Sequence, residues 1–348
     1  MTADILFEVK GCAGVITLNK QQSLNAVTDE MLSAISAHMD IWGDEERIKR
    51  VIIKAAPGRA FSAGGDIRHL YECGIAQNYD YDFFAREYAL NARIAGWHKP
   101  YIALIDGIVM GGGVGVSCHG SHVVAGENIA FAMPEVGIGF FPDVGGSYLL
   151  SRMPGYIGLY LGLTGERLKQ ADCAMTGLAT HTVSSDGMAA LEEALCTNAD
   201  VDQTLADHDF NAGEGRLLNH MDAINLAFSA SSVGEIMGRL ESMMHSEGPQ
   251  GAWAEKTIET LQTKSPTSLE IAFRQITRGK DLSMADCMRM EYRILKRILG
   301  GGEFYEGIRA AIIDKDGAPK WQPSELSDVD ESEIERHFDD LGSEELVL

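Results

Sequence analysis

The central stretch of this chain, residues 100–148, reads PYIALIDGIVMGGGVGVSCHGSHVVAGENIAFAMPEVGIGFFPDVGGSY. It begins with an apolar run at 101–105 that predicts a buried strand, followed by a triple glycine and a small-residue segment that predicts a tightly packed helix. A second short strand is expected at 122–124. Two acids of the stretch, Glu135 and Asp143, stand in a glycine-rich apolar run, and the stretch contains no Lys or Arg. Because a buried charge is costly unless it is paired or has a chemical task, we take this stretch as the candidate site.

Strand and helix patterns alternate in the first half of the chain, and helix patterns dominate the second half. The apolar alternation on both sides of Gly11 predicts a β-hairpin, and a helix is expected from about Thr28. The pair Thr180-His181 is expected to form a turn. Ser265, which precedes a proline, is expected to begin a helix, because proline is favoured in a first helical turn. The chain is therefore predicted to be an α/β protein with an all-α C-terminal region.

Composition excludes several classes of function. The chain has 348 residues, enough for one large domain or two. Its formal net charge of −22 argues against a nucleic-acid partner, because binding to a phosphate backbone needs a basic surface. The six cysteines form no CxxC pair, so we expect free thiols and neither a metal site nor a disulfide framework. No apolar run approaches the roughly 18 residues of a membrane span and no targeting pattern is evident, so we expect a cytoplasmic protein without a membrane partner.

Glycine is concentrated in two loops, at 62–66 and 110–113, that each follow a predicted strand and precede a predicted helix. Neither loop matches the phosphate-binding patterns GxxxxGK(S/T) or GxGxxG, and the nucleophile motif GxSxG is absent. Glycine lets backbone N–H groups approach a ligand, and a helix N-terminus favours negative charge there. The loops therefore predict either an oxyanion hole, in which two N–H groups stabilise one carbonyl oxygen, or two plain tight turns.

The acids Glu135 and Asp143 admit two interpretations. They could act as a general acid and base, or as a nucleophile and the group that orients it. Alternatively, they could cap a helix or take part in salt bridges. Because few cations lie near them in the sequence, we favour a catalytic role. Glu87, next to Arg86 on a predicted helix, is by itself more typical of a surface acid.

The motifs at these positions resemble those of the enoyl-CoA hydratase/isomerase (crotonase) superfamily. The matching pieces are Leu18-Asn19 with Ser23 to Ala26, Ala60 to Ile67, Gly111 to Gly113, and Met133-Pro134-Glu135 through Gly146. The resemblance implies a crotonase-like spiral of ββα units. It also implies two domains, an acyl-CoA-binding core at 1–190 and a helical C-terminal region with an acidic tail at 191–348.

The same resemblance implies roles for individual residues. The N–H groups of Gly65 and Gly112 would form the oxyanion hole for the thioester oxygen, and Glu135 matches the second catalytic glutamate of the hydratases. Hydratases carry another glutamate two residues after the glycine run, where this chain has Gly115, and this difference argues against hydration. The implied substrate-binding residues are Leu24, Ala63, Asp66, Ile67 and Glu87.

Further motifs resemble the 3-hydroxyisobutyryl-CoA hydrolase branch of the superfamily. They include Glu135 with Asp143, and the segments 84–91 (FAREYALN), 290–293 (MEYR) and 319–321 (PKW). The branch implies hydrolysis of a short 3-hydroxyacyl-CoA thioester, such as 3-hydroxyisobutyryl-CoA in valine breakdown, with Glu135 and Asp143 as the catalytic pair. No metal and no cofactor is implied, because CoA is part of the substrate. The alternatives are an enoyl-CoA or dienoyl-CoA isomerase or hydratase, and a noncatalytic CoA-ester binder. The resemblance is also compatible with a homo-oligomer such as a trimer.

Overall fold

The computed structural model describes residues 3–348, which form two compact units. Each unit is assembled from several segments of the chain. The first comprises residues up to 66, 86–132 and 167–216, and the second comprises 67–85, 133–166 and 217–348. Since these units are defined by contacts and interleave along the chain, the predicted division at residue 190 stays a prediction.

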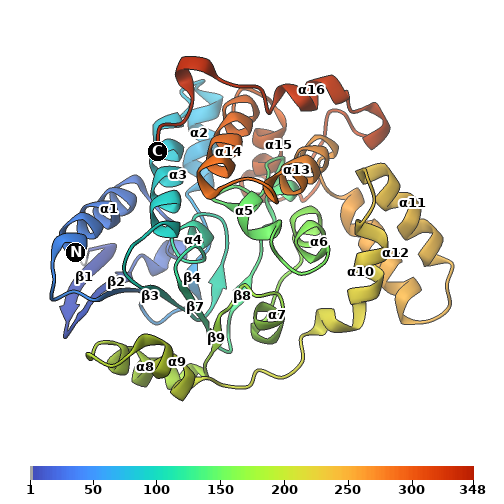
Figure 1. Cartoon of the computed structure of the whole chain (residues 1–348). Coiled ribbons are helices and arrows are strands. Elements are labelled where there is room, and N and C mark those ends of the chain that lie inside the picture. The colour runs from blue at the N-terminus through green and yellow to red at the C-terminus, as the bar shows by residue number, and fades with distance from the viewer. Residues whose placement is uncertain (1–2) are drawn as a thin grey trace. The chain divides into compact units, whose positions relative to one another are not determined.

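The strands of the first unit form two sheets (Figure 1). The larger sheet has the strand order β1-β2-β3-β5-β7-β9, and the smaller sheet has the order β4-β6-β8. The strands are β1 (Ile5–Lys10), β2 (Ala13–Leu18), β3 (Arg50–Ala55), β4 (Ala60–Ser62), β5 (Tyr101–Ile105), β6 (Ile108–Val109), β7 (His122–Ala125), β8 (Ala130–Phe131) and β9 (His181–Thr182). β1 is antiparallel to β2, and the other paired strands of the two sheets are parallel.

The chain follows a repeating path through the two sheets. β3, β5 and β7 each belong to the larger sheet, and the strand that follows each of them, β4, β6 or β8, belongs to the smaller one. A helical segment then leads on to the next strand of the larger sheet. This path is the repeated ββα unit, so the predicted α/β fold class is confirmed.

Helices cover the larger sheet on both faces, with α1 on one side and α8 and α9 on the other (Figure 1). The helices of the first unit are α1 (Asp29–Asp44), most of α3 (Tyr81–Ala95), α4 (Gly112–Gly115), α7 (Gln170–Met175), α8 (Met188–Leu195) and α9 (Val201–His208). Val15, Ile52 and Leu104 of the sheet belong to one apolar cluster with Leu191 and Leu195 of α8. β5 is buried along its whole length, as expected of a parallel strand covered on both faces.

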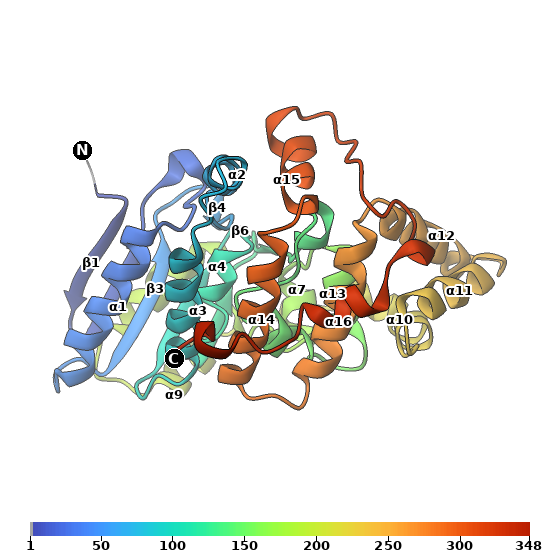
Figure 2. The same cartoon turned by 90° about the horizontal axis from the view of Figure 1, so that it is seen from above.

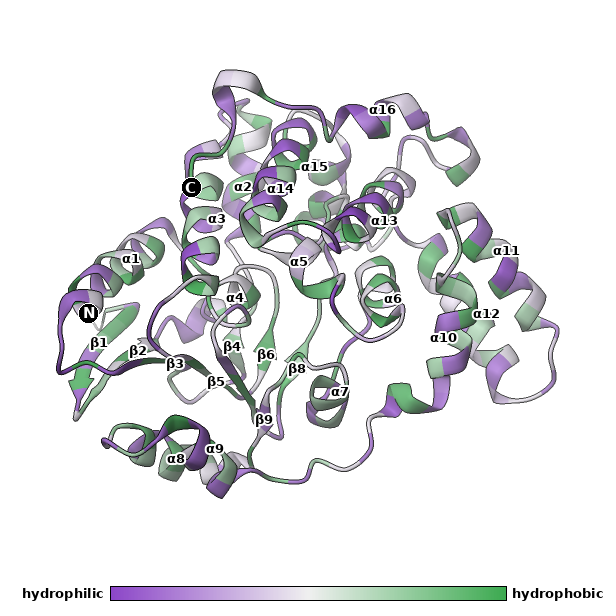
Figure 3. Cartoon of the chain, in the orientation of Figure 1, coloured by the Kyte–Doolittle hydropathy of each residue, from purple (hydrophilic) through white to green (hydrophobic). Residues whose placement is uncertain are grey.

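Within the residues that the structure describes, the second unit contains helices and no β-strand. Its helices are α2 (Ile67–Ile75), α5 (Gly146–Leu150), α6 (Ile157–Thr164), α10 (Met221–Phe228), α11 (Val233–Met244), α12 (Pro249–Gln262), α13 (Pro266–Gly279), α14 (Met284–Ile298), α15 (Glu303–Ile308) and α16 (Glu331–Arg336). Figure 2 shows α14 beside α13, and α13 also contacts α5 and α6. Figure 3 shows hydrophilic and hydrophobic residues mixed along α14, the pattern of an amphipathic helix with one buried face. The predicted all-α C-terminal region is confirmed.

Most local expectations hold, and one is wrong. Gly11 joins β1 to β2 with a φ of +55°, which confirms the hairpin. Thr28 and Ser265 cap α1 and α13, respectively, through their side chains. The turn predicted at Thr180-His181 is wrong, because His181–Thr182 forms β9, parallel to β7. A two-residue strand has no detectable periodicity, and its pairing partner comes from a distant part of the chain.

Candidate active site

The two glycine loops of the first unit lie against each other. One follows β4, and the other leads into α4. The backbone N–H of Met110 donates to the carbonyl oxygen of Ser62 at 3.0 Å. A Cβ atom built on Gly64 would lie 4.0 Å from the backbone nitrogen of Gly112. The predicted oxyanion hole requires this proximity, and the roles of Gly65 and Gly112 stay predictions.

The segment before α1 holds the first glycine loop in place. The N–H of Ala63 donates to the carbonyl oxygen of Leu24 at 3.0 Å, and the N–H of Val27 donates to that of Gly64 at 2.8 Å. Asn25 is buried and has a left-handed φ of +56°. Its side-chain amide donates to two carbonyl oxygens of β4. Leu24 and Ala63, both predicted to bind substrate, are thus tied together, although their contact with a substrate is untested.

Glu87 of α3 lies directly at the second glycine loop. Its side chain is buried, and a Cβ atom built on Gly112 would lie 2.5 Å from its Oε1 atom. One helical turn further along α3, the side chain of the buried Asn91 lies 2.7 Å from the Cβ position of Gly115. The two glycines therefore allow α4 to approach α3 closely. The interpretation of Glu87 as a surface acid is wrong, whereas its predicted contact with substrate is untested.

Two further predicted substrate-binding residues follow the first glycine loop. Asp66 is exposed and belongs to the first unit. Ile67 is half-buried and is the first residue of α2, in the second unit. Their contact with substrate stays a prediction.

The second unit contains Glu135, the first residue of the short 3₁₀ helix Glu135–Ile138. Its carboxyl is buried, forms no ion pair within residues 3–348, and has an Oε2 atom without a hydrogen-bond partner there. Burial, followed by the nearby charges of Asp143 and Glu291, raises the pKa of Glu135 well above its ordinary value. A raised pKa makes the carboxylate a stronger base once it has lost its proton, and the ionised form can also act as a nucleophile.

Asp143 lies in a turn with an unusual backbone. Its side chain is buried, and the N–H of Gly146 donates to its carbonyl oxygen at 2.8 Å. Val144 has a φ of +50° and Gly145 a φ of +88°. The left-handed region is strained for a β-branched residue such as valine, and strained residues are concentrated at functional sites. The backbone of this turn thus supports the prediction that Asp143 is functional, and does not by itself assign its role.

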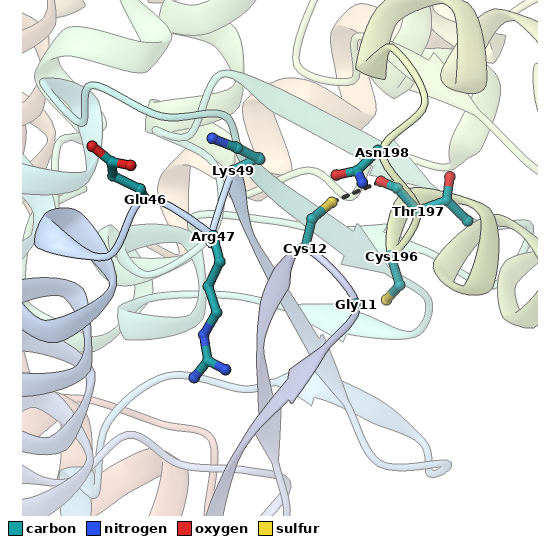
Figure 4. Close-up of a pocket in the computed structure, with 8 residues that line it drawn as sticks. All are labelled: Gly11, Cys12, Glu46, Arg47, Lys49, Cys196, Thr197 and Asn198. Carbon is teal, nitrogen blue, oxygen red and sulfur yellow. Dashed lines mark hydrogen bonds between the residues drawn. The ribbon is translucent and has the colours of Figure 1, made fainter.

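A pocket in the first unit contains none of the predicted site residues (Figure 4). Its lining residues are Gly11, Cys12, Glu46, Arg47, Lys49, Cys196, Thr197 and Asn198. The thiol of Cys12 donates to the carbonyl oxygen of Thr197 at 2.7 Å, while the thiol of Cys196 points elsewhere. Burial raises the pKa of Cys196, which makes this thiol a weak nucleophile at neutral pH. We therefore assign no chemistry to this pocket. All six cysteines are free, as predicted.

The family model described as Enoyl-CoA hydratase/isomerase matches residues 13–338. The chain belongs to this family. The predicted superfamily is thereby confirmed, and the match extends well beyond the core into the helical C-terminal region.

Individual members of the enoyl-CoA hydratase/isomerase family are similar over nearly the whole chain. The 3-hydroxyisobutyryl-CoA hydrolase, mitochondrial, of Xenopus tropicalis is 45% identical over 356 residues, which cover 99% of this chain and 91% of that protein. The crystal structure of an enoyl-CoA hydratase from Rhodobacter sphaeroides has a TM-score of 0.91 at 38% identity and covers 99% of this chain and 100% of that one. The crystal structure of a carnitinyl-CoA dehydratase from Mycobacterium thermoresistibile has a TM-score of 0.93 at 34% identity, with 99% of both chains covered. The resemblance to the hydrolase branch is confirmed by the first of these relatives.

Asn91 and Glu291 are buried polar residues without a predicted role, although both lie in segments that resemble the hydrolase branch. Asn91 follows Glu87 by one turn on the same face of α3, so helical spacing alone could have pointed to it. Glu291 of α14 is 0% exposed and lies on the apolar stripe that includes Cys287, Ile294 and Ile298. An acid on an otherwise apolar stripe is the signal that could have revealed Glu291 in the sequence.

Proposed function

We propose that this family member hydrolyses the thioester bond of 3-hydroxyisobutyryl-CoA and releases 3-hydroxyisobutyrate and CoA. The observation that carries the proposal is the buried carboxyl of Glu135, whose pKa is raised by burial and by the charge of Asp143. Similarity over 99% of this chain to a 3-hydroxyisobutyryl-CoA hydrolase supports the choice of substrate. The reaction would place the protein in valine breakdown.

In the proposed reaction the glycine amides stabilise the oxygen of the thioester. The N–H groups of Gly65 and Gly112 donate to this oxygen, where negative charge develops in the transition state. Removing one such donor costs a factor of about 10²–10³ in kcat in known oxyanion holes. Asp143 orients the 3-hydroxyl group of the substrate or the attacking group.

Glu135 has two chemically balanced routes to the products. In one, its carboxylate oxygen forms a bond to the thioester carbon, the C–S bond breaks, and the CoA thiolate leaves and takes up a proton; water then cleaves the mixed anhydride and restores the carboxylate. In the other, Glu135 removes a proton from a water molecule that attacks the carbon, and the proton passes to the CoA sulfur. Both routes use only water and the substrate, so the proposal includes no cofactor and no metal.

Hydration of an enoyl-CoA is the alternative, since the two similar crystal structures are titled enoyl-CoA hydratase and carnitinyl-CoA dehydratase. The hydratase pattern places a glutamate where this chain has Gly115. A Cβ atom there would already lie 2.7 Å from the side chain of Asn91, so a glutamate has no room without rearrangement. This packing favours hydrolysis over hydration.

A thiol-release assay on a panel of 3-hydroxyacyl-CoA esters tests the proposal directly. We expect CoA release to be fastest with 3-hydroxyisobutyryl-CoA, and no change in the absorbance of an enoyl-CoA or dienoyl-CoA. Hydration or isomerisation without thiol release would support the alternative. Tight binding of CoA esters with neither reaction would indicate a noncatalytic binder.

A cytoplasmic location and a homo-oligomer such as a trimer belong to the same proposal. The relative from Xenopus tropicalis carries the word mitochondrial in its name, and this location differs from the one proposed for this chain. Within residues 3–348, none of the helices has both the length and the apolar character needed to cross a bilayer.

A further inference from the structure

The buried carboxyl group of Glu291 is hydrogen-bonded to the turn that contains Asp143. Its Oε2 atom accepts a hydrogen bond from the N–H of Gly145 at 2.8 Å. Its Oε1 atom accepts from the N–H of Ser147 at 3.0 Å and also from the hydroxyl of Ser147. All these residues belong to the second unit, so α14 and the turn are held together within one compact body.

The hydrogen-bonded turn has a backbone that its own sequence does not favour. Val144 and Gly145 have φ values of +50° and +88°, and the valine is buried. A β-branched residue persists in this region only where the surroundings fix it. The amides on the C-terminal side of Val144 are fixed by Glu291. On the N-terminal side, the side-chain amide of Gln275 donates to the carbonyl oxygen of Pro142. Asp143 thus lies between two anchored points of the backbone.

Glu291 is a costly residue to keep at this place. It is 0% exposed and forms no ion pair in the part of the chain that the structure describes. Burial raises its pKa to about 8, despite the hydrogen bonds from Ser147 and Gly145, which favour the ionised form. Burying an acid without a cation lowers the stability of a fold. The presence of Glu291 at this position therefore suggests that its hydrogen bonds serve a purpose other than stability.

We infer that Glu291 is a positioning residue: it holds the strained 143–147 turn and thereby sets the direction of the Asp143 side chain. This inference rests on the thioester hydrolysis proposed above, because Asp143 is assigned its role there. Glu291 itself does not contact the substrate in this scheme.

Three variants test the inference in the full-length protein. Glu291→Met removes all the acceptors, Glu291→Gln retains one acceptor oxygen, and Ile294→Val weakens the packing of the same helix without changing a hydrogen bond to the turn. We expect kcat of E291M to fall by about 10- to 100-fold, with KM changed by less than about threefold. E291Q should be intermediate, and I294V should keep the wild-type kcat even where its melting temperature falls. If E291M does not fold, Ser147→Ala, which removes a single donor, takes its place.

Two further measurements separate positioning from general stability. The effect of E291M should largely disappear in a background of Asp143→Asn, because a group that acts through Asp143 has no effect once that carboxylate is lost. A crystal structure of E291M should show the 143–147 turn and the Asp143 side chain displaced. Wild-type kcat in folded E291M and E291Q, or full additivity with D143N, would overturn the inference. If the wild type itself releases no thiol, the proposed function fails. The crystal structure of E291M then tests the inference separately, because an undisplaced Asp143 side chain would refute it.

Discussion

The Oε1 atom of Glu87 lies 2.5 Å from the point that a Cβ atom of residue 112 would occupy, so the acid and Gly112 fill adjoining space. Glu87 belongs to α3, and Gly112 is the first residue of α4. Any side chain at position 112 must therefore displace the buried carboxyl or move the N-terminus of α4. Both residues are predicted to contact the substrate, and a substitution of either one should shift the position of the other.

The first prediction concerns Gly112→Ala. The new methyl group would displace Glu87 or the Gly112 amide, so we expect kcat/KM for thiol release to fall by up to about 10²–10³-fold, the value of a lost oxyanion donor. Overpacking should also lower the free energy of unfolding by about 1–3 kcal/mol. Kinetics and urea unfolding measure the two effects. The matched control is Gly238→Ala in α11, where a Cβ atom meets nothing within 4 Å; it should keep full activity and gain about 0.4–1 kcal/mol. A G112A variant with wild-type kinetics would count against the oxyanion hole.

The second prediction concerns the two acids of the candidate site. Glu135→Gln and Asp143→Asn should each reduce kcat by about 10²–10⁴-fold, the usual contribution of a positioned acid or base. The affinity for CoA, measured by calorimetry, should change little, because neither carboxylate is assigned a contact with the CoA portion. Glu270→Gln is the control, since Glu270 is another acid of the second unit whose pKa is raised by burial, and it should retain wild-type turnover. Undiminished turnover in E135Q or D143N would show that the assigned pair is not catalytic.

The third prediction is a dependence of stability on pH. In the unfolded chain Glu135 loses its proton near its ordinary pKa of 4.5, whereas burial and the charge of Asp143 keep the folded carboxyl protonated to higher pH. The folded state binds more protons in this interval, so the free energy of unfolding should decrease as the pH rises. Glu135→Gln removes this contribution, so the free energy of unfolding of the variant should decrease less than that of the wild type as the pH rises above about 4.5.

Calorimetry at several pH values measures this dependence. Glu291→Gln should act in the same direction, because burial raises the pKa of Glu291 to about 8. Parallel stability curves for the wild type and E135Q would mean that the carboxyl of Glu135 is ionised in the folded protein at the same pH as in the unfolded chain.

Some residues of the candidate site can be predicted from local sequence patterns, whereas others cannot. The acids Glu135 and Asp143 could be identified as candidates because charged residues in an apolar glycine-rich run need an explanation. The burial of Glu87 could not be predicted from the residues next to it in the sequence. Glu87 is buried because α4, a glycine-rich helix later in the chain, packs against it. Glu291 is even more distant in sequence from the turn to which it is hydrogen-bonded, and only its place on an apolar helical stripe indicated that it is buried. Local periodicity predicts the elements, whereas contacts between them depend on the tertiary fold.

The fourth prediction concerns Gly115 and Asn91, whose contact bears on the choice between hydrolysis and hydration. Gly115→Ala would place a methyl group 2.7 Å from the Asn91 amide, so we expect a loss of about 1–3 kcal/mol in the free energy of unfolding. Asn91→Ala alone should lower the free energy of unfolding only slightly, because the buried side-chain N and O atoms of Asn91 have no hydrogen-bond partner within residues 3–348.

In the double variant Asn91→Ala/Gly115→Ala the methyl group has space, so most of the loss should be recovered. The expected interaction energy in the double-mutant cycle is about 0.5–3 kcal/mol, measured by urea unfolding of all four proteins. Additive effects, or a G115A variant as stable as the wild type, would mean that the Asn91 side chain can move away from position 115 at little cost in free energy. The steric argument against a glutamate there would then be lost, and hydration would again have to be weighed equally with hydrolysis.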